Sequence, residues 1–563
     1  MTGVPGGMTT GGFLHRLRLS TATPPLRVAA RSDEPRAAPP GRGRRLSQRL
    51  PANLASTAVA LAAVAYIAVL AVRLPAFLAR AVPNSDTVSA PLLAAAIGTP
   101  GHGAVFLGNH PGYSDLLLSA LALHLPDRAV SSQALTWGVY AASGLLLAAT
   151  LRRLAGWRAA GMAALLGLAA TPALLMSEAS PTGRVSSLAN LVLLGWLGTL
   201  LFGGARRRTT LVAAVLGIGV VTGIDAVSDP LLVAVGVLPF IGTVLVLGLR
   251  FRERSGAALA LGSAGMALAV VTTALLTLGV AGTVPLRAQP NPVQLASFRE
   301  VVHTLHVVGG DTGVALGGIF STLGSGPMSY IEVGVGLLVC AAVVATLLHA
   351  GRSVAGPRPP TARDRAELAH LVFWALVAAA DLTVFLGTSY AADLTGLRYL
   401  TPLLLASAAL LPLLGRRRPV GRALLAVGVA ALAGADAWAL ASVTLPAPVQ
   451  ATPLVRALEA SGVREAYADY WQANVTTWAT GGRLDVRPVT ECGGAGTRLC
   501  PVLVNAAAGW FLDPAGPTAV IVDPSSSVPR PPSATYGKPQ RVIRVENATV
   551  YVYSHPLHLT ASG

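Results

Sequence analysis

Charged residues are scarce in this sequence: Asp, Glu, Lys and Arg make up 12% of its 563 residues, whereas hydrophobic residues make up 53%. A soluble chain of this length carries about twice that share of charge. The apolar residues also gather in many runs that reach the roughly 20 residues a helix needs to cross a bilayer. These features exclude a soluble domain and predict a polytopic membrane protein.

Lysine is nearly absent. Lys538 is the only one, so arginine carries almost all of the positive charge behind the net charge of +17. A strongly basic chain suggests nucleic acid as a partner when its basic residues share one face of a folded unit. Here the arginines stand in short clusters between apolar runs. This placement argues against nucleic acid and is typical of the cytoplasmic loops of membrane proteins.

The sequence also lacks the motifs of common soluble-enzyme sites. It contains no Gly-Lys-Ser/Thr phosphate-binding loop and no His-Glu-x-x-His pair, and the glycines of Gly493–Gly496 lack dinucleotide-binding spacing. His303 and His306 have helical spacing, with Asp311 nearby. They leave a divalent metal open as a cofactor, but a solvated amphipathic helix is the better interpretation. His303 also stays a candidate to support an acceptor.

Only three cysteines are present. Cys340 lies in an apolar run, whereas Cys492 and Cys500 lie close together in the polar loop Glu491–Pro501. On the oxidising side of a plasma membrane these two residues would form a disulfide. The alternative is a pair of free thiols.

The apolar runs predict about eleven membrane-spanning helices. We expect them at Leu54–Val72, Ser131–Leu151, Trp157–Met176, Ser186–Phe202, Thr209–Ile224, Leu231–Leu249, Ala257–Val280, Met328–Leu348, Leu368–Gly387, Tyr399–Leu414 and Ala423–Ser442. Arginine-rich connections alternate with connections that hold isolated arginines only. By the positive-inside rule, we expect a cytoplasmic N-terminus and an extracytoplasmic C-terminus in the plasma membrane.

The composition divides the chain into three parts. Residues 1–50, rich in Pro, Gly and Arg, predict a disordered cytoplasmic tail, and residues 51–445 predict the helical bundle. Residues 446–563 predict a small extracytoplasmic α/β domain. In it we expect helices at Leu454–Ser461 and Gln472–Ala479 and strands at Arg464–Ala468, Arg483–Val489, Thr518–Val522, Arg541–Val545 and Thr549–Tyr553. The predicted fold class is therefore a membrane all-α bundle with a C-terminal α/β domain.

The first extracytoplasmic loop, residues 73–126, holds the leading candidate residues. It is too polar and too rich in Gly and Pro to cross a bilayer, and ordered loops of this kind often carry function. Asp86 is the foremost candidate for a catalytic group, with an exposed loop carboxylate as the plain alternative. Asp115 is the competing acid, and His110 and Tyr113 could support an acceptor.

Polar residues late in the chain add to this set. Arg398 and Tyr399 open the tenth predicted span, where an arginine can either snorkel to the interface or bind a phosphate. Asp381 and Asp436 lie within apolar runs. Intramembrane carboxylates are costly and usually functional, and pairing with a neighbouring helix is the alternative.

The apolar first helix, the long outer loop with Asp86 soon after it, and the late run Arg398–Pro402 together resemble the C-type (GT-C) integral membrane glycosyltransferases. That family includes protein O-mannosyltransferases and aminoarabinose transferases. The stretch Tyr467–Trp471 is also similar to the outer C-terminal domains of bacterial members. The family uses polyprenyl-phosphate sugars on the outer membrane face, so the resemblance implies Asp86 as general base and Arg398 as the ligand of the lipid phosphate.

The resemblance implies transfer of a sugar from such a lipid donor to an envelope glycan or protein acceptor. Several relatives carry paired acids where this loop has Asn84-Ser85-Asp86. Whether the base is Asp86 or Asp115, and whether a metal is used, therefore stays open. A transporter or flippase of lipid-linked precursors is one rival, but it leaves the long first loop and the outer C-terminal region unexplained. A non-catalytic scaffold for envelope assembly is another.

Overall fold

The computed structural model describes residues 42–80, 85–97, 99, 101–107, 112–168, 185–203, 208–283, 286–288, 294–310, 344–345, 347–356, 361–388, 400–414, 419–445, 452–492, 498–511, 514–524, 526, 528–531 and 533–559. The chain divides into two compact units, Met1–Ser47 and Gln48–Gly563. Apart from the first residues of helix α1, every element below belongs to the second unit.

Seven described helices are long and apolar enough to cross a membrane, judged by length and composition. Six of them are α1 (Arg42–Arg80), α4 (Arg128–Ala155), α7 (Val185–Gly203), α8 (Arg208–Ser228), α15 (Ala362–Gly387) and α17 (Pro419–Ser442). The seventh runs through α9 (Pro230–Leu232), a π-helical stretch (Val233–Val237) and α10 (Leu238–Arg250). All seven coincide with predicted spans, which confirms the mainly helical membrane class.

Three further helices lie on predicted spans: α5 (Trp157–Leu168), α11 (Arg252–Thr283) and α16 (Thr401–Leu414). The remaining predicted span, Met328–Leu348, lies mostly outside the described residues. The start of α1 requires one correction, because residues 42–50, which we expected in a disordered tail, are helical. Arg, Leu and Gln favour helix, and these residues extend a helix that the apolar run behind them already nucleates.

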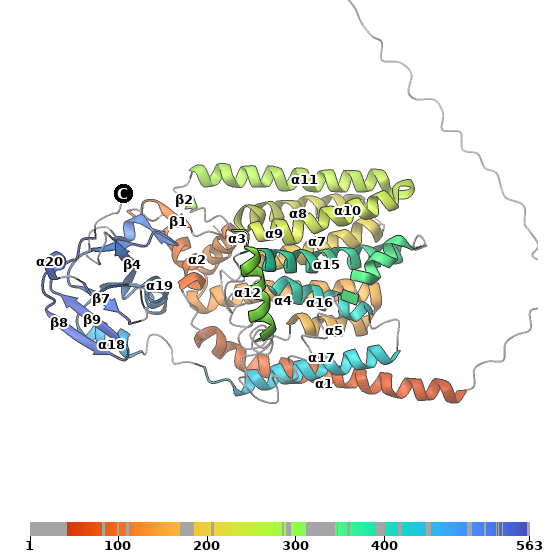
Figure 1. Ribbon diagram of the computed structural model, residues 1–563, viewed down its shortest axis with the longest axis horizontal. Coiled ribbons are helices and arrows are strands. Elements are labelled where there is room, and N and C mark those ends of the chain that lie inside the picture. Colours follow the sequence, from red (N-terminus) through yellow and green to blue (C-terminus); the bar gives the residue numbers. More distant parts are fainter. Residues whose placement is uncertain are drawn as a thin grey trace, which may run out of the picture. The chain divides into compact units, whose positions relative to one another are not determined.

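The bundle is held by close approach of its helices, which lie side by side in Figure 1. Phe373 and Trp374 of α15 are fully buried against Gly195 of α7, where an added Cβ atom would lie 3.0 Å from the Phe373 ring. Helices α8 and α11 come closer still, because a Cβ atom on Gly223 would lie 2.7 Å from the backbone oxygen of Val270. Small residues at such contacts let membrane helices pack where lipid offers no hydrophobic driving force.

The first loop is ordered in the part that the structure describes. It forms α2 (Ser85–Ala96), strand β1 (Val105–Leu107) and α3 (Tyr113–Ala122). Gly112 adopts a left-handed conformation immediately before α3. Leu93, Leu107 and Leu116 form a small apolar core of the loop. The loop is therefore a folded element that can hold side chains in fixed positions.

The C-terminal region is a sheet of six strands with helices beside it. Strands β3 (Glu465–Ala468), β4 (Asp485–Cys492), β5 (Arg498–Pro501), β7 (Thr518–Val522), β8 (Arg541–Val545) and β9 (Ala548–Tyr553) run in the order β5-β4-β3-β7-β9-β8. Its longer helices are α18 (Pro453–Ala460) and α19 (Tyr470–Ala479), and α20 (Ser533–Tyr536) is short. Strand β3 pairs in parallel with both β4 and β7, and the other pairs are antiparallel. All five expected strands and both expected helices are present, whereas β5 and α20 were not expected from the sequence.

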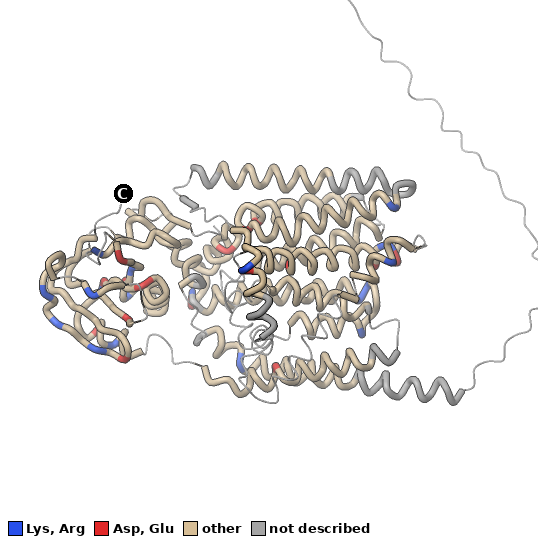
Figure 2. Tube along the Cα trace, viewed as in Figure 1, with Lys and Arg blue, Asp and Glu red and all other residues tan. Residues whose placement is uncertain are grey.

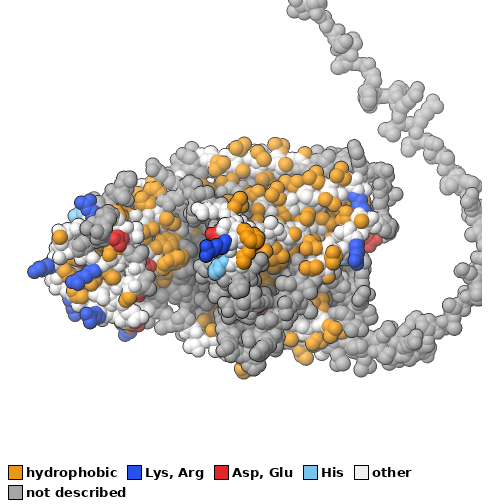
Figure 3. Space-filling model, in the orientation of Figure 1, with side chains coloured by type: hydrophobic (Ala, Val, Ile, Leu, Met, Phe, Trp, Pro, Cys, Tyr) orange, Lys and Arg blue, Asp and Glu red, His pale blue; other side chains and the backbone are white. Residues whose placement is uncertain are grey.

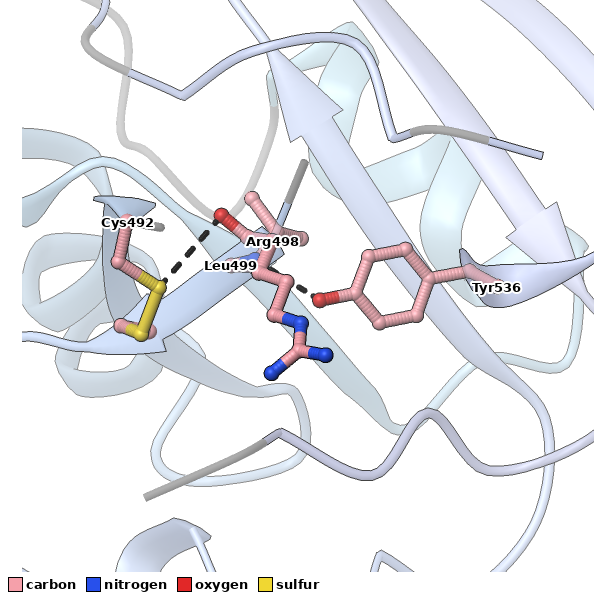
Figure 4. Close-up of a disulfide and its surroundings, with 5 residues drawn as sticks. Cys492, Arg498, Leu499 and Tyr536 are labelled. Atoms are coloured by element: carbon pink, nitrogen blue, oxygen red, sulfur yellow. Dashed lines mark hydrogen bonds between the residues drawn. A yellow bond between two sulfur atoms is a disulfide. The ribbon is translucent and has the colours of Figure 1, made fainter. Parts of the chain in front are cut away.

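Cys492 and Cys500, the predicted pair, form a disulfide between β4 and β5 (Figure 4). Their Cα atoms lie 5.8 Å apart. Next to this pair, the backbone N–H of Leu499 donates a hydrogen bond to the Tyr536 hydroxyl at 2.8 Å. The disulfide therefore joins two paired strands, with Cys500 buried and Cys492 half-buried.

A second sheet joins three distant parts of the chain. It has the order β2-β1-β6, in which β2 (Leu286–Ala288) follows α11 and β6 (Ala506–Ala507) belongs to the C-terminal region. Strand β1 of the first loop is its central member, parallel to β2 and antiparallel to β6. The first loop and the C-terminal region therefore share a sheet, as expected if the C-terminal region packs over that loop.

Candidate active site

Helix α2 carries Asp86 as its second residue. The helix begins at Ser85, which is fully buried and whose hydroxyl donates a hydrogen bond to the backbone oxygen of Tyr470 in α19. Tyr470 is itself held in place, because the amide of Asn505 donates to its phenol oxygen at 2.8 Å and Asp469 caps the start of α19. The C-terminal region therefore fixes the first residue of α2. The Asp86 side chain lies outside what the structure describes.

The chain that leaves α2 is held by the same region. The backbone N–H of Ala508 donates to the oxygen of Ala104 at 2.8 Å, and that of Gly509 donates to the oxygen of His102 at 2.7 Å. A Cβ atom on Gly509 would lie 2.1 Å from the backbone oxygen of Gly101, so the contact requires glycine there. The C-terminal region thus holds α2 at its first residue and holds the chain again at residues 101–104, after α2 ends. These two sets of contacts form a clamp on α2.

A buried polar network anchors the neighbouring helix α3 on the bundle. Asp115, in the first turn of α3, is 7% exposed. The Ser186 hydroxyl of α7 lies 3.4 Å from the Asp115 carboxylate and 2.9 Å from that of Asp225 in α8. The backbone N–H of Tyr113 also donates to the Ser228 hydroxyl at 3.0 Å. These contacts fix the start of α3 against the ends of α7 and α8.

The network continues beside α3 into the bundle. Asp225 accepts hydrogen bonds from Ser187 at 2.9 Å and from Asn190 at 3.1 Å. Asp229 lies 2.9 Å from the same Ser187 hydroxyl and accepts from the backbone N–H of Leu231 at 3.0 Å, which caps α9. Each serine has one proton to donate and can serve only one carboxylate at a time. These carboxylates are held by side-chain and backbone donors, an arrangement that suits an anchor.

The described part of the chain contains no group of three or more His, Cys, Asp or Glu side chains arranged to hold a metal ion. Among the three acids of the network, Asp115 is the one that belongs to the first loop. Its carboxylate faces serine and a second acid within the bundle. Chemically, this network can tie the loop to the helices.

The other predicted site residues are described only in part. Tyr113 begins α3 and is half-buried, and burial raises the pKa of its phenol. His110, Arg398 and Tyr399 lie outside the described residues. The structure therefore brings together the helices of Asp86 and Asp115, since α2 packs against α3. One reaction needs both a base and a phosphate ligand, so we expect Asp86 and Arg398 to line the same cavity at the outer membrane boundary; this stays a prediction.

The stretch with the histidine pair is helical, which agrees with the interpretation preferred from its sequence. Helix α12 (Phe298–Gly310) carries His303 on an exposed surface. The His306 side chain and Asp311 lie outside the described residues.

The intramembrane acids are buried, and one of them has a clear structural partner. Asp381 of α15 is 1% exposed and accepts a hydrogen bond at 3.1 Å from the backbone N–H of Leu403, in the first turn of α16. A carboxylate at a helix N-terminus satisfies a free donor and the helix dipole. Asp436 of α17 is 3% exposed. For Asp381, the structure therefore favours pairing with a neighbouring helix over a transport role.

The sequence interpretation missed Ser186, Ser187 and Asn190, which supply the donors of the buried network. A usable signal was present, because Asp225 and Asp229 directly follow the predicted span Thr209–Ile224, in a connection that the positive-inside rule places on the same side of the membrane as the first loop. Polar residues at the ends of successive predicted spans converge when those spans pack side by side. The pairing itself depends on which helices become neighbours.

No protein-family model and no characterised protein matches the sequence. The chain is similar in structure to ArnT from Cupriavidus metallidurans. Against its apo crystal structure the TM-score is 0.39 at 14% identity, and against the crystal structure bound to undecaprenyl phosphate it is 0.40 at 12% identity. Each match covers 88% of this chain and 97% of the other. Scores this low carry no functional detail over to this chain.

Proposed function

We propose that this chain is a membrane glycosyltransferase that transfers a sugar from a polyprenyl-phosphate donor to a cell-envelope acceptor outside the cytoplasm. The observation that carries the proposal is that the first loop is attached to two regions, the C-terminal region and the helical bundle. Helix α2, with Asp86, is clamped by the C-terminal region, and α3 is anchored on the bundle through Asp115. A general base must be held in a fixed position relative to its substrate, and this arrangement provides that rigidity.

In the proposed reaction, Asp86 accepts the proton of an acceptor hydroxyl as its oxygen attacks the anomeric carbon of the sugar. The bond between that carbon and the lipid phosphate oxygen breaks. The phosphate leaves with the bonding electrons, and Arg398 balances its charge. Tyr399, the next residue in the sequence, also binds the phosphate. A single displacement of this kind inverts the anomeric centre. The polyprenyl chain would lie against the apolar bundle, where its burial contributes binding energy.

Asp86 and Asp115 receive different roles in this proposal. The Asp115 carboxylate is buried and faces the Ser186 hydroxyl beside Asp225. A buried carboxylate that lies against the bundle is poorly placed to meet an acceptor that arrives from the water side. We therefore assign proton transfer to Asp86 and positioning of the loop to Asp115.

The membrane orientation is part of the proposal. In Figure 2, Lys and Arg positions along the chain gather at the end of the bundle where α10 ends and α15 begins. At that end Arg363 donates to the backbone oxygen of Leu154 at 2.7 Å and 3.0 Å. Under the positive-inside rule this end is cytoplasmic, so the first loop and the C-terminal region lie outside. Reporter fusions at Gly563 test this orientation, and a cytoplasmic C-terminus would overturn it.

The deciding experiment uses the full chain in proteoliposomes. The donors are undecaprenyl phosphate carrying radiolabelled mannose or arabinose, and envelope membranes from the source cells supply the acceptors. We expect radiolabel in an acceptor fraction that no longer extracts with the lipid. A flippase would instead move the intact labelled lipid between leaflets without transfer. A scaffold would do neither, and either result would overturn the proposal.

A further inference from the structure

Helix α12 differs from the spanning helices in its direction. It lies between α11 and α15 in the chain and contacts α15. In Figure 1 its axis runs across the axis of α15, whereas the spanning helices run along it. Because α15 has the length and composition of a membrane span, a helix that runs across it lies along the membrane plane.

The depth of α12 is set by backbone contacts to the end of α15. Leu295 forms an isolated antiparallel bridge with Thr388, the residue after α15. The backbone N–H of Ala296 donates to the oxygen of Gly387, the last residue of α15, at 2.9 Å. These contacts hold the start of α12 at the level where the span ends. In a bilayer, that level is the boundary between hydrocarbon and headgroups.

The start of α12 is also encoded locally. The backbone N–H of Ser297 donates to the Glu300 carboxylate at 2.6 Å, and the N–H of Glu300 lies 3.3 Å from the Ser297 hydroxyl. This reciprocal pair is a capping box, which starts a helix without help from tertiary contacts. The helix is therefore defined where it leaves the bridge to α15.

The described side chains of α12 divide into an apolar and a polar set. Phe298 is 84% exposed and Val302 is 46% exposed, and at roughly 100° per residue they lie within about 40° of each other. Arg299, Glu300 and His303 are exposed on the other side, whereas Thr304 is buried. Figure 3 shows hydrophobic side chains beside charged ones over this helix. Exposed apolar side chains that gather on one side of a helix mark an interaction surface.

We propose that α12 is an interfacial helix that lies on the bilayer, with Leu295, Phe298 and Val302 among the lipid acyl chains and Arg299, Glu300 and His303 toward water. Hydrophobic side chains also lie over the described part of the bundle beside this helix (Figure 3), which identifies the bilayer as the occupant of the apolar surface. Arg299 and Glu300 offset each other in charge, so the attachment depends on apolar burial and not on anionic lipid. This proposal does not rest on the glycosyltransferase reaction.

Spin labels measure the depth of α12 directly. Cys340→Ser provides the background, in which Cys492 and Cys500 stay joined, and single nitroxides are placed at Phe298→Cys, Val302→Cys and His303→Cys. The full chain is studied in phosphatidylcholine vesicles, with and without phosphatidylglycerol. Electron paramagnetic resonance then compares collisions with oxygen, which concentrates in acyl chains, and with a water-soluble nickel chelate.

We expect the oxygen-to-nickel ratio to be several-fold higher at positions 298 and 302 than at 303, and unchanged by phosphatidylglycerol. A ratio at 298 and 302 equal to that at 303 would mean that this face meets water, and would overturn the proposal. Protection of 298 and 302 from both reagents would mean that protein covers them, with the same consequence. A lipid whose acyl chain carries a diazirine provides a test on the unmodified chain, and we expect its label on residues 295–302.

Discussion

The helical bundle and the C-terminal α/β region are held together by different physical means. In the bundle, helices meet at glycine: Gly195 lies against the aromatic pair of α15, and Gly223 lies against the α11 backbone. In the C-terminal region, Val486, Ile521 and Val550 form a buried core between strands and helices, and a disulfide ties two strands. The bundle is therefore held by close packing in an apolar solvent, whereas the C-terminal region is held by hydrophobic burial in water.

The first loop depends on both means at once. Its helix α3 is anchored on the bundle through Asp115 and Tyr113, and its strand β1 pairs with β6 of the C-terminal region. A defect in either region should therefore reach the loop. Because α2 with Asp86 is clamped by the C-terminal region, we expect damage there to affect turnover more than damage in the bundle. The predictions below test this difference.

The largest expected effect is that of Asp86→Asn on turnover. Asparagine keeps the size of the side chain but cannot accept a proton at neutral pH, so transfer from the lipid-linked donor should fall by ~10²–10⁴-fold. Donor binding should persist, since the lipid is held by apolar burial and by Arg398. Radiolabel transfer in proteoliposomes, with donor binding measured separately, checks both statements.

Asp115→Asn is the matched variant, and we expect it to loosen the loop while retaining part of the activity. A fully active Asp86→Asn together with an inactive Asp115→Asn would move the base to Asp115. Full activity in both variants would remove this loop from the chemistry.

Gly509→Ala should have the second-largest effect on turnover. The added Cβ atom would lie 2.1 Å from the backbone oxygen of Gly101, so the clamp behind α2 has to open. A displacement of about 1 Å at a catalytic group can cost up to ~10²-fold in rate. Hydrogen exchange should increase in residues 85–107 and not in the bundle. Gly434→Ala adds a Cβ atom with nothing within 4 Å and serves as the control. Unchanged exchange in 85–107 would mean that the clamp does not hold the loop.

Removal of the disulfide should destabilise the C-terminal region alone. Replacing Cys492 and Cys500, which are 8 positions apart, by serine releases a short loop in the unfolded chain. The expected cost is about 2–3 kcal/mol. Proteolysis of the C-terminal region along a urea titration measures it, and Cys340→Ser, which keeps the pair, is the control. An equal loss of stability in the bundle would show that the two regions unfold as one.

The smallest expected effect belongs to the bundle. Gly223→Ala would bring a Cβ atom within 2.7 Å of the Val270 backbone oxygen and 2.8 Å of the Thr273 side chain, so α8 and α11 must separate. We expect a loss of about 1–3 kcal/mol, typical of overpacking, seen as a lower melting temperature in detergent. Gly217→Ala lies on the same helix with nothing within 4 Å. If both variants melt alike, close approach does not hold this helix pair.

Much of the fold could be predicted from the sequence because its signals are local. Hydropathy alone locates the spanning helices, since a bilayer demands an apolar run of a given length. Short runs rich in Val and Ile identify the strands Thr518–Val522 and Arg541–Val545, which the structure reproduces as β7 and β8. The pairing of Cys492 with Cys500 could also be expected, because the only other cysteine lies in an apolar run.

The site was decided by tertiary structure, because its contacts join residues far apart in the chain. The sequence identified Asp86 and Asp115 as acids of one loop, but it could not reveal that Ser85 meets Tyr470 or that Asp115 faces Ser186. Nor could it reveal that Gly509 allows two backbones to touch. Hydrophobic periodicity determines which face of an element is buried, but the partner of that face is set by how all the elements pack together.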